Sequence, residues 1–165
     1  MTHQQFIRAL DLATDRDKIT TLLAEAQDYY LLWKGRAPGA DETDALFASS
    51  PPGCDPAASH RLGLYLDDSL SGVAELCFGF PKPDDAYLGL MILAPRVRSR
   101  GHGSAFLAHL ENLARAAKAS DLYLAVLEAN PRGAAFWARH GFSRTGLFRH
   151  DDATGHTLHR LVKPL

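Results

Sequence analysis

The most informative stretch of the sequence is YLGLMILAPRVRSRGHGSAFLAHLENLARAAK, residues 87–118. Its first part, Tyr87 to Leu93, is apolar throughout, which predicts a strand buried on both faces. From Gly103 to Lys118, apolar residues recur at the period of a helix. The loop between them carries Gly101-His102-Gly103. A strand-to-helix junction of this kind gathers free backbone N–H groups at the positive end of a helix, so the stretch predicts an anion site.

The charges along this stretch indicate what kind of anion binds there. Residues 96–118 contain one acid, Glu111, against five basic residues, which are Arg96, Arg98, Arg100, Arg115 and Lys118. The whole chain has a net charge of −1, so the local excess indicates one bound polyanion and not a nucleic-acid surface. A Walker loop is excluded because no lysine follows the glycines, and a dinucleotide fingerprint because Phe106 stands where a third glycine belongs.

The elements downstream complete a crossover. The segment from Leu122 to Leu127 is predicted to be a second buried strand, which makes residues 87–127 a parallel strand–helix–strand unit. Asn130 is expected to cap a short helix that has Pro131 at its first position. A closing hairpin is then expected, with strands at Phe142–His150 and Thr157–Val162.

The elements upstream add three strands and two helices. Phe6–Leu10 is predicted to be a short strand, and Thr14 to open a helix, with Asp17 in capping-box spacing, that closes with Tyr29–Trp33. The remaining expectations are a short acidic helix at Asp41–Phe47, a loop at Ser49–Pro56, and strands at His60–Leu66 and Leu70–Phe80 joined by the turn Asp67–Ser69. The sum is a mixed α/β sheet with helices on its faces.

The composition fits a single domain over residues 1–165, with 46% hydrophobic and 22% charged residues. The longest apolar run, Leu88 to Ala94, is far shorter than a membrane-spanning helix, which needs ~20 residues. The N-terminus has no charged segment followed by an apolar one, so no signal peptide is expected. Cys54 and Cys77 form neither a disulfide framework nor a metal quartet, and a cytoplasmic location fits best.

Two motifs carry a resemblance to a known family. The loop Arg98-x-x-Gly101-x-Gly103 resembles the pyrophosphate loop of the GNAT superfamily of acyl-CoA-dependent N-acyltransferases, whose pattern is Gln/Arg-x-x-Gly-x-Gly/Ala. The segment from Leu124 to Phe142 resembles the later strand–helix segment of that superfamily. The resemblance implies a mixed, mostly antiparallel central sheet with helices on both faces, in which one parallel β-α-β crossover forms the CoA site.

The resemblance also implies which residues contact CoA. Backbone N–H groups from Arg100 to Ser104 would cradle the pyrophosphate. The strand at Leu90–Leu93 would pair with the pantetheine arm beside a splayed neighbour, and one N–H near Ile92 would polarise the thioester carbonyl. Asn130 would hydrogen-bond the arm or only cap its helix. The full set implied is Ile92, Leu93, Arg98, Ser99, Arg100, Gly101, His102, Gly103, Ser104, Asn130, Phe136 and Trp137. Acetyl-CoA is the implied cosubstrate, and no metal is implied.

The sequence departs from the family at the group that releases the thiol. Many members have a tyrosine that protonates the departing sulfur, but the matching position here is Trp137. An indole N–H donates a hydrogen bond but cannot supply a proton. Tyr87, Tyr29 and Tyr30 are the candidates to replace it, and the sequence selects none of them.

The general base has two candidates. Attack on the thioester requires a neutral amine, which a base assists directly or through water. Glu75 interrupts an apolar run, and Glu128 ends the second crossover strand. Either one activates the amine, or both simply face solvent. The aromatic residues Tyr29, Tyr30 and Trp33 line an acceptor pocket or pack in the core.

These observations predict an acetyl-CoA-dependent N-acetyltransferase that acetylates a primary amine of a small molecule or protein by direct attack on the thioester. The alternative is a non-catalytic acyl-CoA-binding sensor or regulatory domain, which the missing tyrosine favours. Neither a nucleic-acid nor a membrane partner is expected, and the C-terminal strand leaves room for pairing in a homodimer. His156 and His159 are three apart in a predicted strand, so they point to opposite faces and make a poor metal pair.

Overall fold

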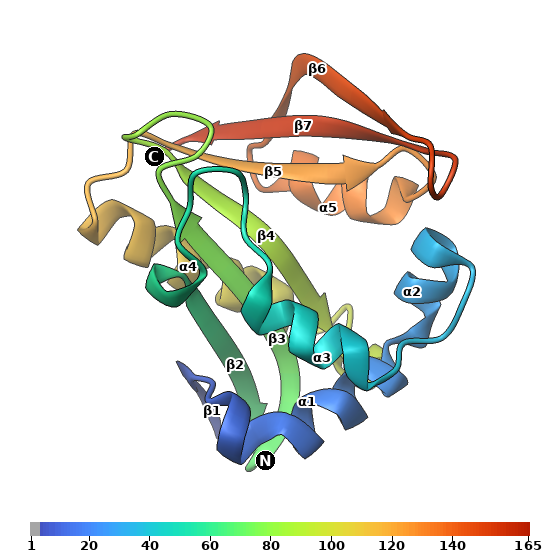
Figure 1. Ribbon diagram of the computed structural model, residues 1–165. Helices are drawn as coiled ribbons and strands as arrows, with labels where there is room; N and C mark the ends of the chain where they lie inside the picture. The colour runs from blue at the N-terminus through green and yellow to red at the C-terminus, as the bar shows by residue number, and fades with distance from the viewer. Residues whose placement is uncertain (1–3) are drawn as a thin grey trace.

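The computed structural model of the chain describes residues 4–165, which form one seven-stranded sheet with helices on both faces (Figure 1). In spatial order the strands are β1 (Gln5–Ala9), β2 (His60–Leu66), β3 (Ser69–Phe78), β4 (Ala86–Leu93), β5 (Asp121–Leu127), β7 (His156–Pro164) and β6 (Ser143–Asp151). Every neighbouring pair is antiparallel except β4 with β5. The predicted fold class, with its single parallel crossover, is confirmed.

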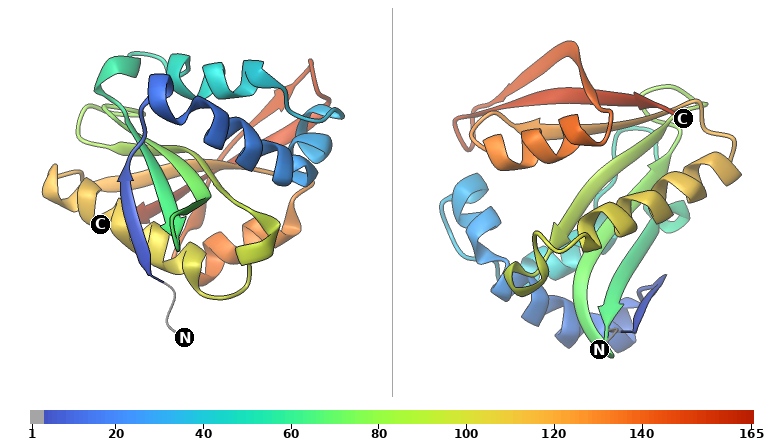
Figure 2. Two further views of the ribbon diagram at one scale, coloured as in Figure 1. Left: turned by 90° about the horizontal axis from the view of Figure 1, so that it is seen from below. Right: turned by 180° about the vertical axis from the view of Figure 1, so that it is seen from behind.

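The helices divide between the two faces of this sheet (Figure 2). One face carries α1 (Leu12–Glu25), α2 (Gln27–Lys34) and α3 (Ala40–Ala48). The other carries α4 (His102–Ala116) and α5 (Pro131–Arg139). Short 3-10 turns, η1 (Pro56–Ala58) and η2 (Pro95–Val97), precede β2 and follow β4. Among residues 4–165, no helix is both long and apolar enough to cross a membrane.

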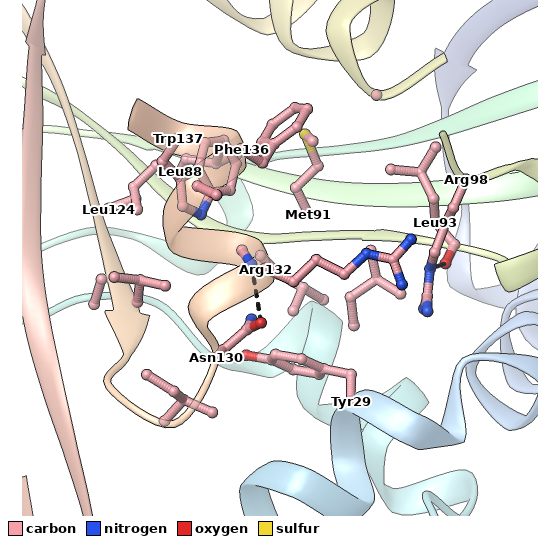
Figure 3. Close-up of a pocket in the computed structure, with 18 of the residues that line it drawn as sticks. Tyr29, Leu88, Met91, Leu93, Arg98, Leu124, Asn130, Arg132, Phe136 and Trp137 are labelled. Carbon is pink, nitrogen blue, oxygen red and sulfur yellow. Dashed lines mark hydrogen bonds between the residues drawn. The ribbon is translucent and has the colours of Figure 1, made fainter. Parts of the chain in front are cut away.

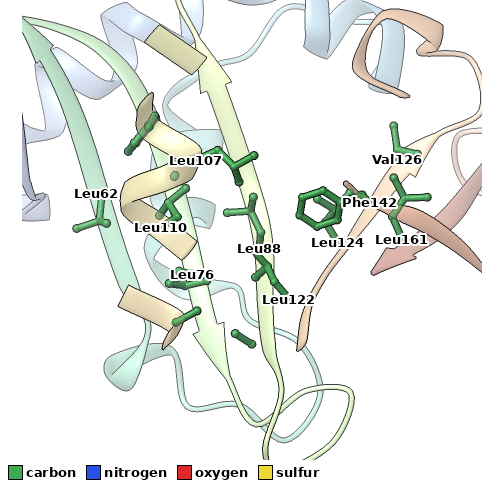
Figure 4. Packing of buried hydrophobic residues seen from close by; sticks show 14 of the residues in the cluster. Leu62, Leu76, Leu88, Leu107, Leu110, Leu122, Leu124, Val126, Phe142 and Leu161 are labelled. Atoms are coloured by element: carbon green, nitrogen blue, oxygen red, sulfur yellow. The ribbon is translucent and has the colours of Figure 1, made fainter. Parts of the chain in front are cut away.

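Each face of the sheet has its own hydrophobic core. On the α4 side, Phe106, Leu107 and Leu110 are buried against leucines of β2 to β5 (Figure 4). Leu107 and Leu110 belong to the apolar helix face that the sequence predicts, and Phe106 adds to it. The second core joins α1, α2 and α3 to the opposite side of the sheet, and its fully buried members include Ile19, Leu22, Leu23 and Val73. The two cores fix the helices, and with them the ends of β4 and β5.

β4 separates from β5 after a short contact. The two strands pair at two positions, where β4 contributes Ala86 and Tyr87. Further along, β4 keeps its antiparallel partner β3 but has a gap on its other edge, and Leu90, Met91 and Leu93 are half-buried there. The prediction of a strand buried on both faces is therefore wrong for its second half, because an edge without a neighbouring strand stays open. The splay that the resemblance implies is present.

β4 also contains a β-bulge at Gly89. Leu88 pairs with Leu76 and Leu90 pairs with Glu75, so Gly89 is an extra residue without a partner in β3. The extra residue reverses the alternation of side chains along the strand. Leu88 faces the α4 core, whereas Leu90 faces the α1 core. The alternation of side chains between the two faces of the sheet therefore shifts by one residue at the point where the gap begins.

The first helix begins and ends differently from the prediction. Its N-cap is Asp11 and not Thr14, because the Asp11 carboxylate accepts hydrogen bonds from the backbone N–H groups of Ala13 and Thr14. The helix then stops before Ala26, and the aromatic segment forms the separate helix α2. The break turns the Tyr30 side chain into the core, where it is 3% exposed.

Candidate active site

The gap between β4 and β5 opens into a cavity of about 530 Å³, which we call the slot (Figure 3). Its walls come from β4, the loop after β4, the end of β5 and α5, and α2 borders it. Most of the residues assigned to CoA lie along it: Ile92, Leu93, Arg98, Ser99, Gly103, Ser104, Asn130, Phe136 and Trp137. The remaining three, Arg100, Gly101 and His102, lie outside the lining but in the adjoining loop and helix start.

One end of the slot is the start of α4. Gly101, the N-cap residue, has a left-handed backbone with φ of +86°, and among residues 4–165 no side chain caps the helix. The backbone N–H of Ala105 donates to the Gly101 carbonyl, so the N–H groups of His102, Gly103 and Ser104 have no acceptor within the helix. These donors, at the positive end of the helix dipole, suit the anion that the sequence predicts.

Gly103 lies close to Phe136 of α5 and to Leu93 of β4. A Cβ atom on Gly103 would lie 3.3 Å from Cε2 of Phe136 and 3.6 Å from Cδ1 of Leu93. Any side chain here would fill the space between β4 and α5. Glycine at this position therefore keeps the slot open, whereas Gly101 serves the turn of the backbone.

The side chains at this end already have partners in the protein. His102 Nδ1 lies 2.9 Å from Gln5 Oε1, and Ser104 Oγ lies 2.8 Å from His140 Nε2. His140 Nδ1 lies 2.8 Å from the carbonyl oxygen of Phe136, so Nδ1 donates there and Nε2 accepts the Ser104 hydroxyl proton. The side chains brace the helix start, and the backbone is what remains open to a ligand.

The predicted cluster of five basic residues is wrong as a single cluster. Arg96 Nε donates to Glu25 Oε2 of α1 at 3.0 Å. Arg115 and Lys118 lie at the other end of α4, roughly 20 Å from its start at a rise of 1.5 Å per residue. Sequence proximity placed these residues together, but the length of the helix separates them.

Arg98 lines the slot but is already engaged. Its Nε donates to the Leu93 carbonyl at 3.0 Å, and its Nη2 donates to Asp28 Oδ1 of α2 at 3.1 Å. The guanidinium lowers the pKa of the Asp28 carboxyl below its ordinary value. Arg98 therefore ties α2 to the end of β4, and its positive charge is partly neutralised before any ligand binds.

Two arginines outside the predicted set of CoA-binding residues also line the slot, Arg132 and Arg139 of α5. Figure 3 shows Arg132 extending across the slot toward Arg98. Arg132 Nη2 donates to Ser99 Oγ at 3.2 Å, and the guanidinium has no carboxylate partner within residues 4–165. The sequence position of Arg132 could have identified it, because Arg132 lies in the first turn of α5, two residues after the N-cap Asn130.

The backbone of β4 presents N–H groups to the gap. The N–H of Ala94 donates to the Ser71 carbonyl of β3 at 2.9 Å. Because N–H groups alternate in direction along a strand, that of Ile92 also points to β3, and those of Met91 and Leu93 point toward the slot. The donors near Ile92 that are free for a ligand are therefore those of its two neighbours.

The residues of the later motif serve both structure and slot. Asn130 Oδ1 accepts a hydrogen bond from the Gly133 N–H at 3.0 Å, so Asn130 caps α5 as predicted. Asn130 also lines the slot. Phe136 and Trp137 meet edge to face with ring centroids 4.9 Å apart, and Trp137 also meets Phe142 at 5.4 Å. Trp137 is thus a packing residue on the wall of the slot.

A second cavity of about 510 Å³, which we call the side pocket, lies on the α1–α3 side of the sheet. Its walls come from α2, α3, residues 49–52, β4 and the hairpin of β6 and β7. Four aromatic side chains line it, namely Tyr30, Trp33, Phe80 and Tyr87. The slot and the side pocket share two lining residues, Gly89 and Leu90. The two cavities therefore meet at the bulge of β4.

Glu75 lies at this meeting point. It lines the side pocket and is 6% exposed, so the alternative that it faces solvent is wrong. A Cβ on Gly89 would lie 3.1 Å from Glu75 Oε1, which shows how close the carboxylate is to the bulge. Burial raises the pKa of the Glu75 carboxyl, partly offset by a hydrogen bond of 3.1 Å from Cys77 Sγ and by the charge of Arg61.

Glu128 is placed differently. Its carboxylate oxygen Oε1 lies 3.2 Å from His159 Nε2, its side chain is 63% exposed, and it lines neither cavity. Of the tyrosine candidates, Tyr29 lines the slot, whereas Tyr30 and Tyr87 line the side pocket. Burial raises the pKa of all three phenols, that of Tyr29 to about 12.

One residue holds a wall of the side pocket in place. Arg61 is 7% exposed and donates to backbone carbonyls at the end of α3 and in the segment after it. Its acceptors are the carbonyl oxygens of Leu46, Phe47, Ser49, Pro56 and Ser59. A guanidinium can satisfy several carbonyls at once because its donors point in fixed, different directions. Within residues 4–165, no group of three or more His, Cys, Asp or Glu side chains is placed to hold a metal ion.

Comparison with known proteins shows which family and which solved structures this chain resembles. A comparison with protein families matches residues 20–142 to the acetyltransferase (GNAT) family. Among solved structures, an acetyltransferase from Thermus thermophilus has a TM-score of 0.77 and 22% identity and covers 99% of this chain and 100% of its own. A ribosomal-protein-alanine N-acetyltransferase from Brucella melitensis has a TM-score of 0.74 and 20% identity over 97% and 99%. A comparison with curated proteins gives no match.

Proposed function

Because the chain belongs to the acetyltransferase (GNAT) family, we propose that it transfers an acetyl group from acetyl-CoA to a primary amine of a small molecule or a protein. The observation that carries this proposal is the meeting of two cavities at the bulge of β4. The slot offers backbone donors and arginines, which suit a phosphorylated, extended donor. The side pocket offers a buried carboxylate, which suits an amine.

The slot residues fit acetyl-CoA in order along its length. The free N–H groups at the start of α4, together with Arg132, would bind the pyrophosphate. The N–H groups of Met91 and Leu93 would bind the pantetheine arm as a neighbouring strand does, and the donor nearest the thioester would stabilise the developing oxyanion. A preorganised donor of this kind contributes roughly 3 kcal/mol to the transition state.

Glu75 is the proposed general base. A primary amine of pKa ~10.4 costs about 4.6 kcal/mol to deprotonate at pH 7, so a nearby carboxylate that accepts its proton lowers the barrier. The amine nitrogen forms a bond to the acyl carbon, the carbon–sulfur bond breaks, and the proton passes to Glu75 directly or through one water. CoA leaves as its thiolate. Glu75 is favoured over Glu128 because it lines the side pocket and Glu128 does not.

No tyrosine is needed to release the thiol. Tyr29 shares the slot with the proposed donor, but burial holds its pKa at about 12. Proton transfer from such a phenol to a thiolate, whose conjugate acid has a pKa of about 8.5, is uphill by several kcal/mol. Tyr29 is therefore proposed to donate a hydrogen bond at most, and the presence of Trp137 in place of the family's tyrosine does not prevent the reaction.

The proposal is tested first by calorimetric titration with acetyl-CoA, with free CoA for comparison. One-to-one binding is expected, and Gly103→Val should weaken it by about tenfold or more because the new side chain meets Phe136 and Leu93. Ala108→Val is the matched control, since Ala108 is an exposed residue of the same helix. Absence of binding would overturn the proposal.

A thiol-release screen with a panel of amines then separates enzyme from sensor. Steady release of CoA with at least one amine supports the acetyltransferase. Saturable binding of acetyl-CoA with no release across amino acids, polyamines, aminoglycosides and peptide N-termini would favour the acyl-CoA-binding sensor instead.

A further inference from the structure

The hairpin of β6 and β7 contributes two arginines to the lining of the side pocket, Arg149 of β6 and Arg160 of β7. Arg149 pairs with Leu158, and Leu158 lies two residues from Arg160, so both arginines project from the same face of the hairpin. His156 Nε2 donates to the Leu32 carbonyl of α2 at 2.8 Å, which ties the hairpin to α2. The turn between β6 and β7 lies near α2 in Figure 1. Both arginines line the pocket from this hairpin.

Neither arginine has an acidic partner in the part of the chain that the structure describes. Arg160 lies over the ring of Phe80 at 5.1 Å, and Arg149 forms no ion pair with any residue of 4–165. The charges of both oppose the rise in the pKa of Tyr87, so their field reaches the interior of the pocket. Two cations on one face of the hairpin, without a counterion among residues 4–165, suit an anionic ligand.

The carboxylates of the same pocket do not neutralise this pair. Glu42 is bound to Lys34 Nζ at 2.5 Å and lies 3.7 Å from Arg36. Glu75 has no hydrogen bond from a cationic side chain within residues 4–165, and the Cys77 thiol is its donor. The pocket therefore holds one buried carboxylate beside the bulge and, on the hairpin, two cations without a described counterion. A ligand that satisfies both ends carries an ammonium or amine at one end and an anion at the other.

We propose that the acceptor is an amine that also carries a carboxylate, with the amine at Glu75 and the carboxylate at Arg149 and Arg160. This inference rests on the proposed acetyltransferase function and narrows its acceptor. Arginine suits a carboxylate because its planar fork donates two parallel hydrogen bonds. The aromatic side chains of Tyr30, Trp33 and Tyr87 then contact the apolar part between the two charged ends.

The test compares paired acceptors in the thiol-release assay. Each amino acid is measured beside its amide, which keeps the amine and removes the negative charge, and a series from glycine to 5-aminopentanoate varies the spacing. Amino acids are expected to exceed their amides by about tenfold or more in kcat/KM, the size of a charge-assisted hydrogen bond. Equal turnover of acid and amide would overturn the inference and leave the acetyltransferase proposal standing. No turnover of any amine would instead count against the proposed function.

Variants of the hairpin supply the second arm. Arg149→Gln and Arg160→Gln should each raise the KM for the preferred amino acid by about tenfold and leave the KM for its amide unchanged. Arg144→Gln is the matched control, because Arg144 is an exposed arginine of β6 that lines neither cavity. If all three variants act alike, the general positive charge of the hairpin accounts for the effect, and the specific site is rejected.

A binding measurement keeps the inference independent of turnover. The chain has two tryptophans, of which Trp33 lines the side pocket and Trp137 lines the slot. In the Trp137→Phe variant, the fluorescence of Trp33 therefore reports on the side pocket. Titration with the preferred amino acid in the presence of CoA should change this signal, and titration with the amide should not. A response to both, with equal affinity, would contradict the proposed carboxylate site.

Discussion

The slot and the side pocket are built in opposite ways. The slot is formed largely by two continuous stretches, from β4 into α4 and from β5 into α5, and its binding groups include backbone N–H donors. The side pocket collects side chains from α2, α3, β3, β4, β6 and β7, which are far apart in the sequence. A site made from backbone geometry suits a ligand that is the same throughout a family. A site made from side chains can take a different ligand in each member.

The two cavities also differ in how their charges are paired. In the slot, Arg98 is already paired with Asp28, and the helix start contributes a positive dipole without a side chain. In the side pocket, Glu75, Arg149 and Arg160 lack ionic partners within residues 4–165. Donor binding should therefore resist most single substitutions, whereas chemistry and acceptor choice should depend on a few side chains.

The largest expected effect is that of Glu75→Gln. Removing the general base should lower kcat about 100-fold or more, and acetyl-CoA affinity should stay within about twofold because Glu75 does not line the slot. Glu128→Gln is the matched control and should change kcat less than about threefold, since Glu128 lines neither cavity. Calorimetry and the thiol-release assay measure the two quantities. A large loss with Glu128→Gln and none with Glu75→Gln would reverse the assignment of the base.

The pH dependence gives the same variant a second readout. Burial raises the pKa of Glu75 above its ordinary value of 4.5, so the carboxylate that accepts the proton is lost as the pH falls through this raised pKa. The wild-type kcat/KM should therefore show an ascending limb at acidic pH that Glu75→Gln lacks. The folded state binds the proton more tightly than the unfolded state, so the charged carboxylate lowers stability above the unfolded pKa. Glu75→Gln should not lower the free energy of unfolding at neutral pH.

The second expected effect concerns the wall of the side pocket. Arg61→Met keeps the volume of the side chain but removes its donors to the carbonyls of residues 46–59, and it should lower the free energy of unfolding by about 2 kcal/mol in urea. The acceptor KM should rise and the acetyl-CoA affinity should not. Arg16→Met is the control, because the exposed Arg16–Asp44 ion pair should be worth less than about 1 kcal/mol. An equal loss of acetyl-CoA affinity would show that the cavities are not independent.

The difference between a site built from local backbone geometry and a site built from distant side chains explains which features the sequence predicts. Gly101, Gly103 and Asn130 act through local backbone geometry, so a short motif is enough to find the start of α4 and the cap of α5. Arg149 lines the side pocket because β7 pairs with β5 and β6 pairs with β7. No residue spacing along the chain encodes this strand order. The sequence therefore predicts the fold class, whereas the side pocket can be found only from the structure.

Burial and charge pairing also needed the structure. Glu75 interrupts an apolar run, which marks it as unusual, but the sequence does not show whether such a carboxylate faces water or a pocket. Arg115 stands near the glycine loop in the sequence, yet the length of α4 carries it to the far end. The bulge at Gly89 leaves no periodic signal, because apolar residues flank it on both sides.

The third expected effect is at the wall that both cavities share. Gly89→Ala places a Cβ 3.1 Å from Glu75 Oε1, so the carboxylate must shift by a few tenths of an ångström. Small displacements of a catalytic group are costly, and kcat should fall roughly tenfold. In the Glu75→Gln background, the same change should cost much less, because the group it displaces no longer acts as a base. Additive effects in this double-mutant cycle would show that Gly89 acts on something other than Glu75.

The smallest expected effect tests the slot itself. Arg132→Gln removes a cation that has no carboxylate partner in the described chain, and it should weaken acetyl-CoA binding by roughly three- to fivefold, the size of a solvent-exposed charge contact. Arg115→Gln removes the same charge at the far end of α4 and should change the affinity less than about twofold. The difference should shrink as salt is raised from about 50 to about 500 mM, which calorimetry can follow. Equal losses for the two variants would mean that the overall charge of the crossover attracts CoA, as the sequence alone suggested, and that the placement of Arg132 adds nothing.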